Sequence, residues 1–187
     1  YKEFQNKNFI YLDSASTTLK HESVISKLKE YNSKYSANIH RSVYPIAEKA
    51  TYEFEQSRRK VANFINSKSE EIIFTKSATE SINLIAYSWG LSNLKKDDVI
   101  LISKMEHHSN IIPWQFVAKK TGCQLKYIPM LDNGVLDIDS LDSLLSEKVK
   151  FISLIHQSNV TGIINPIKEI VKKAHSYNAL VLIDAAQ

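Results

Sequence analysis

The rhythm of apolar residues changes part-way along the chain and predicts two kinds of structure. In the first part, apolar side chains recur at helical spacing over 22–35 and over 45–65, with an irregular polar stretch at 36–44 between them. Such spacing predicts two amphipathic helices, and Pro45 suits the first turn of the second one. We expect an extended segment over 1–20, with a short strand at 10–12, to precede them.

From Glu71 onward, short apolar runs alternate with amphipathic stretches. The predicted strands lie at 72–74, 99–102, 125–128, 149–155 and 181–183, and the predicted helices at 78–90, 110–121, 138–146 and 166–177. This alternation indicates βαβ units and a buried, mostly parallel sheet. The fold class is therefore α/β, with three layers in which helices flank the sheet. The predicted organisation is an N-terminal extended segment (1–20), a helical lead-in (21–70) and an α/β domain (71–187).

Composition excludes several classes of protein. Apolar residues make up 43% of the 187 residues, charged residues 24%, and the net charge is +4. The lysines are spread along the chain rather than gathered in a basic stripe with aromatic residues, so we expect no nucleic-acid partner. No apolar run reaches the roughly 18 residues of a membrane span, so we expect no membrane partner. Cys123 is the only cysteine, which excludes an internal disulfide.

Ligands of open parallel sheets bind beyond the C-terminal ends of the strands, so the polar residues at those ends are the candidates for chemistry. Small hydroxyl residues follow the first predicted strand, at Thr75-Lys76-Ser77-Ala78-Thr79-Glu80-Ser81. At the start of a helix, this segment is either a phosphate cradle that uses Thr79 or an ordinary N-cap. Neither a GxGxxG nor a GxxxxGK[ST] pattern is present, so a standard dinucleotide or P-loop site is not expected.

Histidines follow the next strand, in Met105-Glu106-His107-His108. A histidine there could act as a general acid or base, or stack on a flat cofactor, whereas the structural alternative is a pair of exposed helix caps. We expect no metal site, because adjacent histidines in an extended chain point to opposite sides. His107 is thus a candidate for chemistry, with capping as the alternative.

The last two strand ends also carry polar residues. Asn159 could hydrogen-bond a phenolic or carboxylate oxygen, although Asn and Gly are also common turn residues. Asp184, at the end of the final apolar run, could hold the N–H of a heteroaromatic ring, although it could also cap a helix. Four polar sites at successive strand ends of one sheet should converge, with Gln187 beside Asp184.

Taken together, these segments resemble the fold-type I pyridoxal-phosphate enzymes of the class V aminotransferase group, and most closely the SufS-type (group II) cysteine desulfurases. The resemblance rests on YLDSA (11–15), NIHRS (38–42), SATESIN (77–83), MEHHSNIIPW (105–114), SNVTG (158–162) and DAAQ (184–187). They follow in order over nearly the whole chain. The MEHHSNIIPW stretch is specific for the SufS branch, whereas SATE and DAAQ mark the wider superfamily.

The resemblance implies a role for each candidate residue. Thr79, with the backbone N–H groups of Ala78 and Thr79, would hold the phosphate of pyridoxal 5'-phosphate. His107 would stack on the pyridine ring and take part in proton transfer. Asp184 would pair with the pyridine nitrogen. The remaining implied residues are Asn159 and Gln187 near the phenolic oxygen, and His40 and Arg41 near the active-site entrance.

The resemblance also implies a function. The intact protein would convert L-cysteine to L-alanine and an enzyme persulfide for iron–sulfur cluster assembly, as a homodimer that passes sulfur to a SufE-type or scaffold protein. The alternatives are a selenocysteine lyase or another class V enzyme, and, from a different class, a non-catalytic α/β binding domain. The compartment implied is the plastid stroma for a eukaryotic source and the cytoplasm otherwise.

The resemblance further implies that two reactive residues lie outside these 187 residues. The Schiff-base lysine and the persulfide-forming cysteine of the family would follow the DAAQ segment. Cys123 lies in a predicted turn, so we expect it to be structural rather than the nucleophile, since a reactive thiol needs an exposed, electropositive setting. The chain would then be an N-terminal half that is inactive alone.

Overall fold

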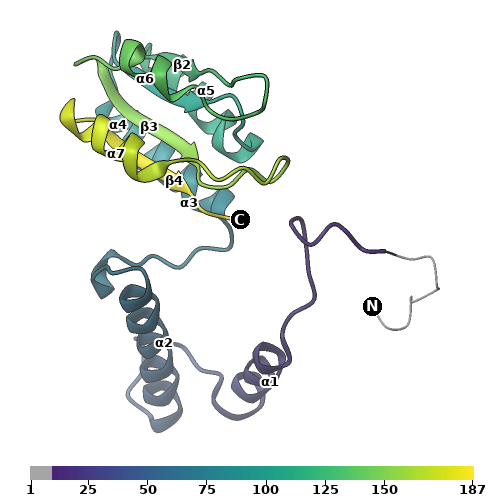
Figure 1. The fold of residues 1–187 in the computed structure, drawn as a ribbon. Coiled ribbons are helices and arrows are strands. Elements are labelled where there is room, and N and C mark those ends of the chain that lie inside the picture. The colour runs from purple at the N-terminus through teal and green to yellow at the C-terminus, as the bar shows by residue number, and fades with distance from the viewer. Residues whose placement is uncertain (1–9) are drawn as a thin grey trace. The chain divides into compact units, whose positions relative to one another are not determined.

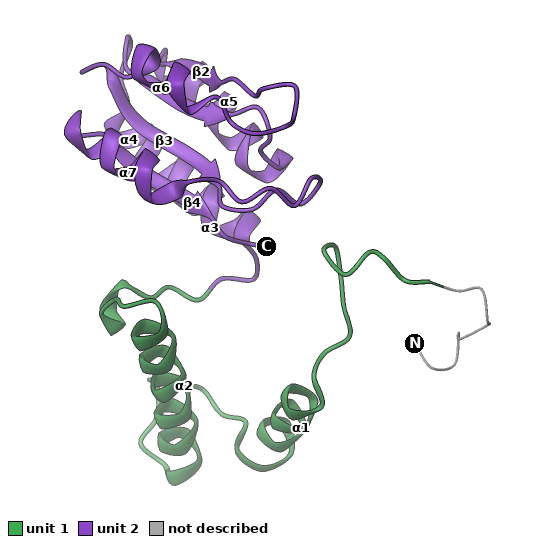
Figure 2. Ribbon diagram, viewed as in Figure 1, with its two compact units in different colours: residues 1–74 green, residues 75–187 purple. Residues whose placement is uncertain are grey.

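The structure, a computed structural model, describes residues 10–187 and forms two compact units (Figure 2). Unit 1 comprises residues 1–74 and unit 2 comprises residues 75–187. The part of the predicted N-terminal segment over 1–9 lies outside the described residues. Within the part of the chain that the structure describes, no helix is long and apolar enough to cross a membrane.

Unit 1 is helical, as its apolar spacing predicts. Helix α1 (Glu22–Glu30) continues into a π-helical turn, η2 (Tyr31–Tyr35), and α2 (Pro45–Phe64) is the longest helix. His21 caps α1 by accepting the N–H of Ser23 at 3.2 Å, and Pro45 occupies the first turn of α2. A 3₁₀ turn, η3 (Ser69–Glu71), ends the helical part. The predicted helices at 22–35 and 45–65 are thus confirmed.

Two predicted strands in unit 1 are wrong. Residues 10–12 belong to no strand, and the Tyr11 hydroxyl instead donates to the carbonyl of Thr17 at 2.6 Å. Residues 72–74 also form no strand. The N–H of Ile72 donates to the Ser69 carbonyl at 3.2 Å, and its carbonyl accepts from the Arg58 guanidinium. Because these local partners use its backbone groups, β-branched composition alone does not make a strand here.

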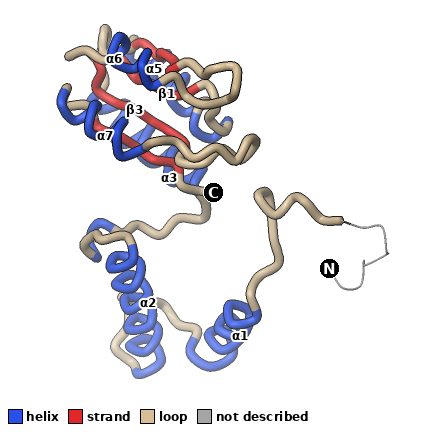
Figure 3. Tube along the Cα trace, in the orientation of Figure 1, coloured by secondary structure: helices blue, strands red, loops and turns tan. Residues whose placement is uncertain are grey.

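Unit 2 alternates helices and strands (Figure 3). Its elements are α3 (Ala78–Ile85), the π-helical turn η4 (Ala86–Gly90), α4 (Leu91–Asn93), β1 (Val99–Ser103), the 3₁₀ turn η5 (His108–Asn110), α5 (Ile112–Thr121), β2 (Gln124–Ile128), α6 (Ile138–Leu144), β3 (Val149–Ile155), α7 (Ile167–Ser176) and β4 (Leu180–Asp184). The four strands are all parallel, in the order β2-β1-β3-β4. Every strand predicted between 99 and 183 is confirmed.

Side chains that alternate along the strands pack into two separate hydrophobic cores, one on each face of the sheet. On one face, Leu101 and Ile152 pack with residues of α6 and α7. On the other face, Ile100 packs with Ile82 of α3 and Trp114 of α5. Figure 1 shows the strands between these two layers of helices. The predicted α/β fold, a three-layer parallel sheet flanked by helices, is confirmed.

The sheet order creates a place for a ligand. From β1 the chain passes to β2 on one side, whereas β3 lies on the other side of β1 and leads to β4. Such a reversal opens a crevice beyond the C-terminal strand ends, where open α/β sheets bind ligands. Ser103, Ile155 and Asp184 end the three strands β1, β3 and β4 around this point. The C-terminal end of the chain lies beside α3 (Figure 1).

Candidate functional site

A cavity of about 220 Å³ lies within unit 2, at the C-terminal ends of the strands and the start of α3. Its lining includes all six residues expected to hold a cofactor: Ala78, Thr79, His107, Asn159, Asp184 and Gln187. Ser77, Ser109, Ile155 and Ala186 complete the lining. Four chain segments that are distant in sequence therefore meet at one point. The volume is below the roughly 300–1,000 Å³ of typical ligand pockets, which fits a small planar ligand.

The start of α3 offers backbone donors to this cavity. Ser77 is the N-cap: its hydroxyl accepts the N–H of Glu80 at 3.2 Å and its carbonyl accepts the N–H of Ser81 at 3.1 Å. The N–H groups of Ala78 and Thr79 precede these, and first-turn N–H groups have no intrahelical acceptor. The N-cap alternative is therefore confirmed at Ser77, whereas the phosphate cradle at Ala78 and Thr79, which line the cavity, stays a prediction.

His107 follows β1 and is exposed at the cavity. Its Nδ1 accepts the backbone N–H of Ser109 at 3.2 Å and lies 2.7 Å from the Ser109 hydroxyl. A backbone N–H can only donate, so Nδ1 of the neutral ring carries a lone pair and the proton sits on Nε2. His107 is thus a helix cap through Nδ1, and Nε2 is left for a ligand.

Asn159 is presented by a turn that follows β3. The buried Ser158 organises this turn, since its hydroxyl accepts the N–H groups of Val160 and Thr161, each at 3.2 Å. The N–H of Gly162 donates to the Ser158 carbonyl at 2.9 Å, and Gly162 takes a positive φ of 73°. The turn is therefore held by Ser158 and Gly162, which leaves the exposed Asn159 available to the cavity.

Asp184 ends β4 and is only 5% exposed. One carboxylate oxygen, Oδ1, accepts the N–H of Ala186 at 3.0 Å, and the Asp184 carbonyl accepts the N–H of His156 at 2.8 Å. A buried carboxylate is stable only when it is paired, and a cationic ring N–H would supply such a partner. Gln187 lies three residues further on and lines the same cavity.

Sequence reasoning missed a buried polar cluster behind this cavity. Glu106 accepts the N–H of Ile155 at 3.0 Å, the amide of Asn110 at 2.6 Å and the hydroxyl of Ser103. Asn110 in turn accepts the Trp114 indole N–H at 3.0 Å and the Ser153 hydroxyl at 2.6 Å. The spacing of Glu106, Asn110 and Trp114, four residues apart each time, is the sequence signal that could have revealed it.

The charge of Glu106 is affected by its surroundings. Burial raises the pKa of its carboxyl above the ordinary value of 4.5, and the negative charge of Asp184 raises it further. The hydrogen bonds from Ser103, Ile155 and Asn110 act in the opposite direction, but burial is the largest effect. The carboxylate of Asp184 therefore adds to the effect of burial on the pKa of Glu106, and of these two acids only Asp184 lines the cavity.

His40 and Arg41 lie elsewhere, in unit 1. They line a cavity of about 660 Å³ together with residues of α2. His40 has a positive φ of 60°, its N–H donates to the Thr51 hydroxyl at 3.1 Å, and its Nε2 lies 3.1 Å from Glu55. Their expected place at an active-site entrance stays a prediction.

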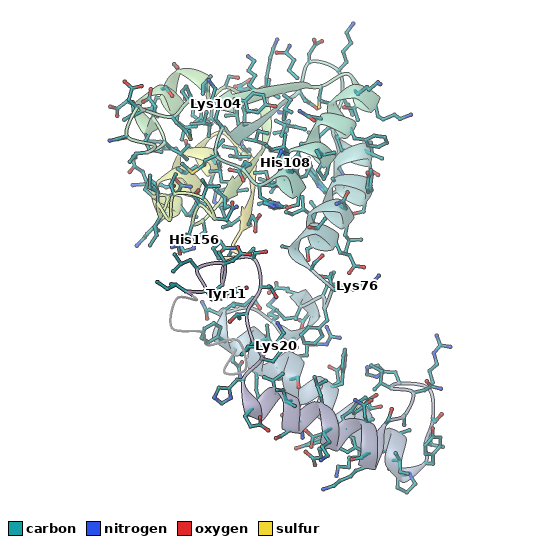
Figure 4. The ribbon with its side chains drawn as sticks, turned by 90° about the vertical axis from the view of Figure 1, so that its right-hand side faces the viewer. Tyr11, Lys20, Lys76, Lys104, His108 and His156 are labelled. Atoms are coloured by element: carbon teal, nitrogen blue, oxygen red, sulfur yellow. The ribbon has the colours of Figure 1, made fainter. Side chains whose placement is uncertain are left out.

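Other reactive groups are distant from the cavity or absent from its lining. Cys123 is buried in the core on the α3 and α5 face, and burial raises the pKa of its thiol, which disfavours the reactive thiolate. Lys104, His108 and His156, labelled in Figure 4, follow β1 and β3 but do not line the cavity, and no lysine among residues 10–187 does. Within this same span, no three His, Cys, Asp or Glu side chains gather to hold a metal.

The cavity thus combines four kinds of group: anion-directed N–H donors, an imidazole, amides and a buried carboxylate. This donor set fits a planar aromatic ring with an attached phosphate and a protonatable ring nitrogen. Pyridoxal 5'-phosphate has these features. The residues present therefore fit the cofactor that the sequence led us to expect.

Comparison with known proteins gives similarity over the whole chain. The Aminotransferase class-V family model matches residues 10–187. A probable cysteine desulfurase of Synechocystis is 45% identical over 100% of this chain and 44% of its own length. A second, from Halalkalibacterium halodurans, is 46% identical over 100% of this chain and 46% of its own length. The chain spans less than half the length of these curated relatives.

Solved structures agree with this comparison. The apo structure of a cysteine desulfurase from Thermococcus onnurineus superposes with a TM-score of 0.91 at 39% identity, covering 97% of this chain and 45% of that one. The cysteine desulfurase CsdA of Escherichia coli superposes with a TM-score of 0.84 at 35% identity, covering 95% of this chain and 45% of that one.

Proposed function

This chain belongs to the class V aminotransferase family, and from that premise we propose that the protein is a pyridoxal-phosphate-dependent cysteine desulfurase. Its substrate would be L-cysteine, and its products L-alanine and sulfur held as an enzyme persulfide. The named relatives and structural neighbours described above support this choice of reaction. They are about twice as long as this chain, so the proposal concerns an intact enzyme that carries further residues.

One observation carries the proposal. The six residues that strand-end chemistry or the family resemblance assigned to a cofactor line a single cavity in unit 2. Separate structural roles, such as caps and turns, would explain each residue by itself but would not bring all of them to one cavity. Their convergence at the point where the strand order reverses is the arrangement expected of a cofactor site.

The residues of this chain would each perform one task. When bound, pyridoxal phosphate acts as an electron sink for the amino acid joined to it. The N–H groups of Ala78 and Thr79 and the Thr79 hydroxyl would bind its phosphate. Asp184 would hold the proton on the ring nitrogen, which keeps the ring electron-poor. Asn159 and Gln187 would orient the phenolic oxygen.

His107 would bind the cofactor ring and would also transfer a proton. In the neutral ring Nδ1 accepts the Ser109 N–H and Nε2 carries the proton, so the ring would present Nε2–H to the cofactor and would give up the Ser109 bond at Nδ1 when it takes up a second proton. The lysine that forms a covalent link to the cofactor, and the cysteine that accepts sulfur, would lie outside these 187 residues.

Our proposal also covers the branch of the family, the oligomeric state and the compartment. We propose the SufS-type (group II) branch because of the MEHHSNIIPW segment, of which Glu106, Asn110 and Trp114 form one buried cluster. With this branch we propose a homodimer that transfers sulfur to a SufE-type or scaffold protein for iron–sulfur assembly. The compartment we propose is the plastid stroma for a eukaryotic source and the cytoplasm otherwise.

The experiment that tests the function uses the intact enzyme. Purified protein should show a visible absorbance band from the bound cofactor and should release alanine when L-cysteine is added. Asp184→Ala should weaken the band and slow alanine release, whereas Asp132→Asn, on an exposed loop, should change neither. An intact enzyme that gives neither a band nor alanine would favour a non-catalytic binding domain. Alanine release from selenocysteine but not from cysteine would favour a selenocysteine lyase.

A further inference from the structure

We propose that Glu106, together with Asn110 and Ser153, is a positioning residue that holds the His107 imidazole at the cofactor cavity. The inference rests on the proposed function only for the role of His107. The network itself is a feature of unit 2 and is present without any ligand.

The donor and the acceptor of each hydrogen bond in this network follow from the chemistry of its groups. The Trp114 indole N–H can only donate, so it must face Oδ1 of Asn110, and the Asn110 amide N–H must then face Glu106. The Ile155 N–H also can only donate to Glu106. The Ser103 hydroxyl accepts the Met105 N–H at 3.2 Å and is therefore free to donate its own proton to Glu106. Every partner of this carboxyl group is thus a donor, which suits a carboxylate and does not suit an amide.

The network joins the segment that follows β1 to the neighbouring strand β3. Glu106 joins the segment after β1 to Ile155 at the end of β3, and Ser153 of β3 bonds Asn110 in η5. These two strands flank the point where the strand order reverses, and Ile155 itself lines the cavity. The network therefore holds the loop of residues 104–110 against β3, the strand beside β1.

His107 lies within this loop, between the two anchored residues. Its carbonyl accepts the Asn110 N–H at 2.7 Å and its Nδ1 accepts the Ser109 N–H at 3.2 Å. Fixing Glu106 and Asn110 on either side fixes the backbone that orients the imidazole. Glu106 and Asn110 are 7% and 0% exposed, whereas His107 is exposed. Two buried anchors thus support one accessible ring, as a functional side chain requires.

The test compares two substitutions in the 187-residue chain without cofactor. Glu106→Gln keeps the shape but brings an NH₂ group against a set of donors, and Glu147→Gln is the control at an exposed position. The first readout is amide hydrogen exchange by NMR. In Glu106→Gln we expect the Ile155 amide to exchange about tenfold faster, as the loss of a hydrogen bond to a charged group implies. Interior amides of β1 and β3 should keep their rates.

The second readout is one that a purely structural role would not change. The Ser109 N–H donates to Nδ1 of His107, so in the unsubstituted chain and in Glu147→Gln the Ser109 amide should show a scalar coupling across this hydrogen bond to the imidazole nitrogen. In Glu106→Gln this coupling should be lost or much reduced. The milder Ser153→Ala, which removes only the bond to Asn110, should reduce it less and serves if Glu106→Gln does not fold.

Each result decides the proposal. Selective loss at Ile155 and Ser109 supports it. Unchanged coupling at Ser109 in folded Glu106→Gln or Ser153→Ala overturns it, because His107 is then oriented without the network. Uniformly faster exchange at every amide of unit 2 also overturns it, because Glu106 would then be a general stabilising residue. None of these outcomes depends on cofactor binding, so failure of the proposed function would be seen separately in the absorbance and alanine measurements.

Discussion

Units 1 and 2 differ in how far their large apolar side chains are buried. In unit 2, large side chains such as Trp114, Leu101 and Ile152 are completely buried on the two faces of the sheet. In the described part of unit 1, the buried apolar residues are Tyr35, Ala47, Ala50, Ala62 and Ile72, and large ones such as Val43 and Phe64 are 91% and 90% exposed. A cavity of about 750 Å³, lined by residues of α1, η2 and α2, lies within unit 1.

The difference shows which unit carries its own stability. Burial of apolar surface is the main favourable term in folding, and unit 2 has two cores whereas unit 1 has mainly alanines inside. An isolated helix as short as the 9-residue α1 is marginal in water without tertiary packing. The proposed cofactor cavity is built on the well-packed unit, which can hold its groups in place.

The largest expected effect is a cavity in the core of unit 2. Leu101→Ala removes a fully buried side chain of β1, and we expect it to lower the free energy of unfolding by about 2–5 kcal/mol. Leu28→Ala, on α1, removes a side chain that is 56% exposed, and should change it by no more than about 0.5 kcal/mol. Urea unfolding followed by circular dichroism measures both. Similar losses from the two substitutions would contradict the contrast between the units.

The second effect concerns the ligand. Asp184→Asn should weaken binding of pyridoxal 5'-phosphate by about 1.5–3 kcal/mol, the range for a hydrogen bond to a charged group. Titration of cofactor into the 187-residue chain, followed by intrinsic fluorescence, measures the affinity. Asp132→Asn is the control, because Asp132 is exposed and does not line the cavity. Equal affinities for all three proteins would show that Asp184 does not hold the ring nitrogen.

The third effect is the pH dependence of stability through Glu106. Its pKa is raised in the folded chain by burial, so the folded state binds this proton more tightly than the unfolded state. The stabilisation is fully present below the ordinary value of 4.5 and is lost as the pH rises through the raised pKa. The stability of the unsubstituted chain relative to Glu106→Gln should therefore fall as the pH increases above 4.5. Unfolding curves over this range test the sign, and a relative stability that rises with pH would refute it.

The fourth effect is the cap at the start of α3. Ser77→Ala removes the hydroxyl that accepts the Glu80 N–H and should lower the stability of unit 2 by about 1 kcal/mol. Ser77→Thr keeps an acceptor and should lower it less. Thermal unfolding of the three proteins gives the comparison. If Ser77→Ala is as stable as the unsubstituted chain, the cap does not set the start of this helix.

The smallest effect tests matched ion pairs in the two units. Lys27 of unit 1 lies 3.2 Å from Glu30, and Lys173 of unit 2 lies 2.9 Å from Asp142. Both pairs are solvent-accessible, so Lys27→Ala and Lys173→Ala should each leave the midpoint of urea unfolding almost unchanged, and the difference should shrink further at high salt. A clear shift of the unfolding midpoint from Lys27→Ala but not from Lys173→Ala would mean that unit 1 depends on charge rather than on apolar packing.

Much of the fold could be predicted because it depends on local patterns. The apolar period of 45–65 and the run of Val149–Ile155 determine a helix and a buried strand almost by themselves, and both formed within a residue or two of the prediction. The run at 72–74 has the same β-branched character but formed no strand, because a strand also requires a hydrogen-bonded neighbour. Pairing is a non-local property that composition does not contain.

The candidate site, like the fold, was predictable in part from the sequence and in part only from the tertiary structure. Strand-end position and residue type identified Thr79, His107, Asn159 and Asp184, because strand ends of a parallel sheet face one edge, and the family resemblance added Ala78 and the role of Gln187. The tertiary structure decided the order β2-β1-β3-β4, the meeting of these residues in one cavity and the burial of Glu106 against Ile155. Periodicity along a chain fixes which face a side chain takes, whereas only packing between distant segments fixes which partner it meets.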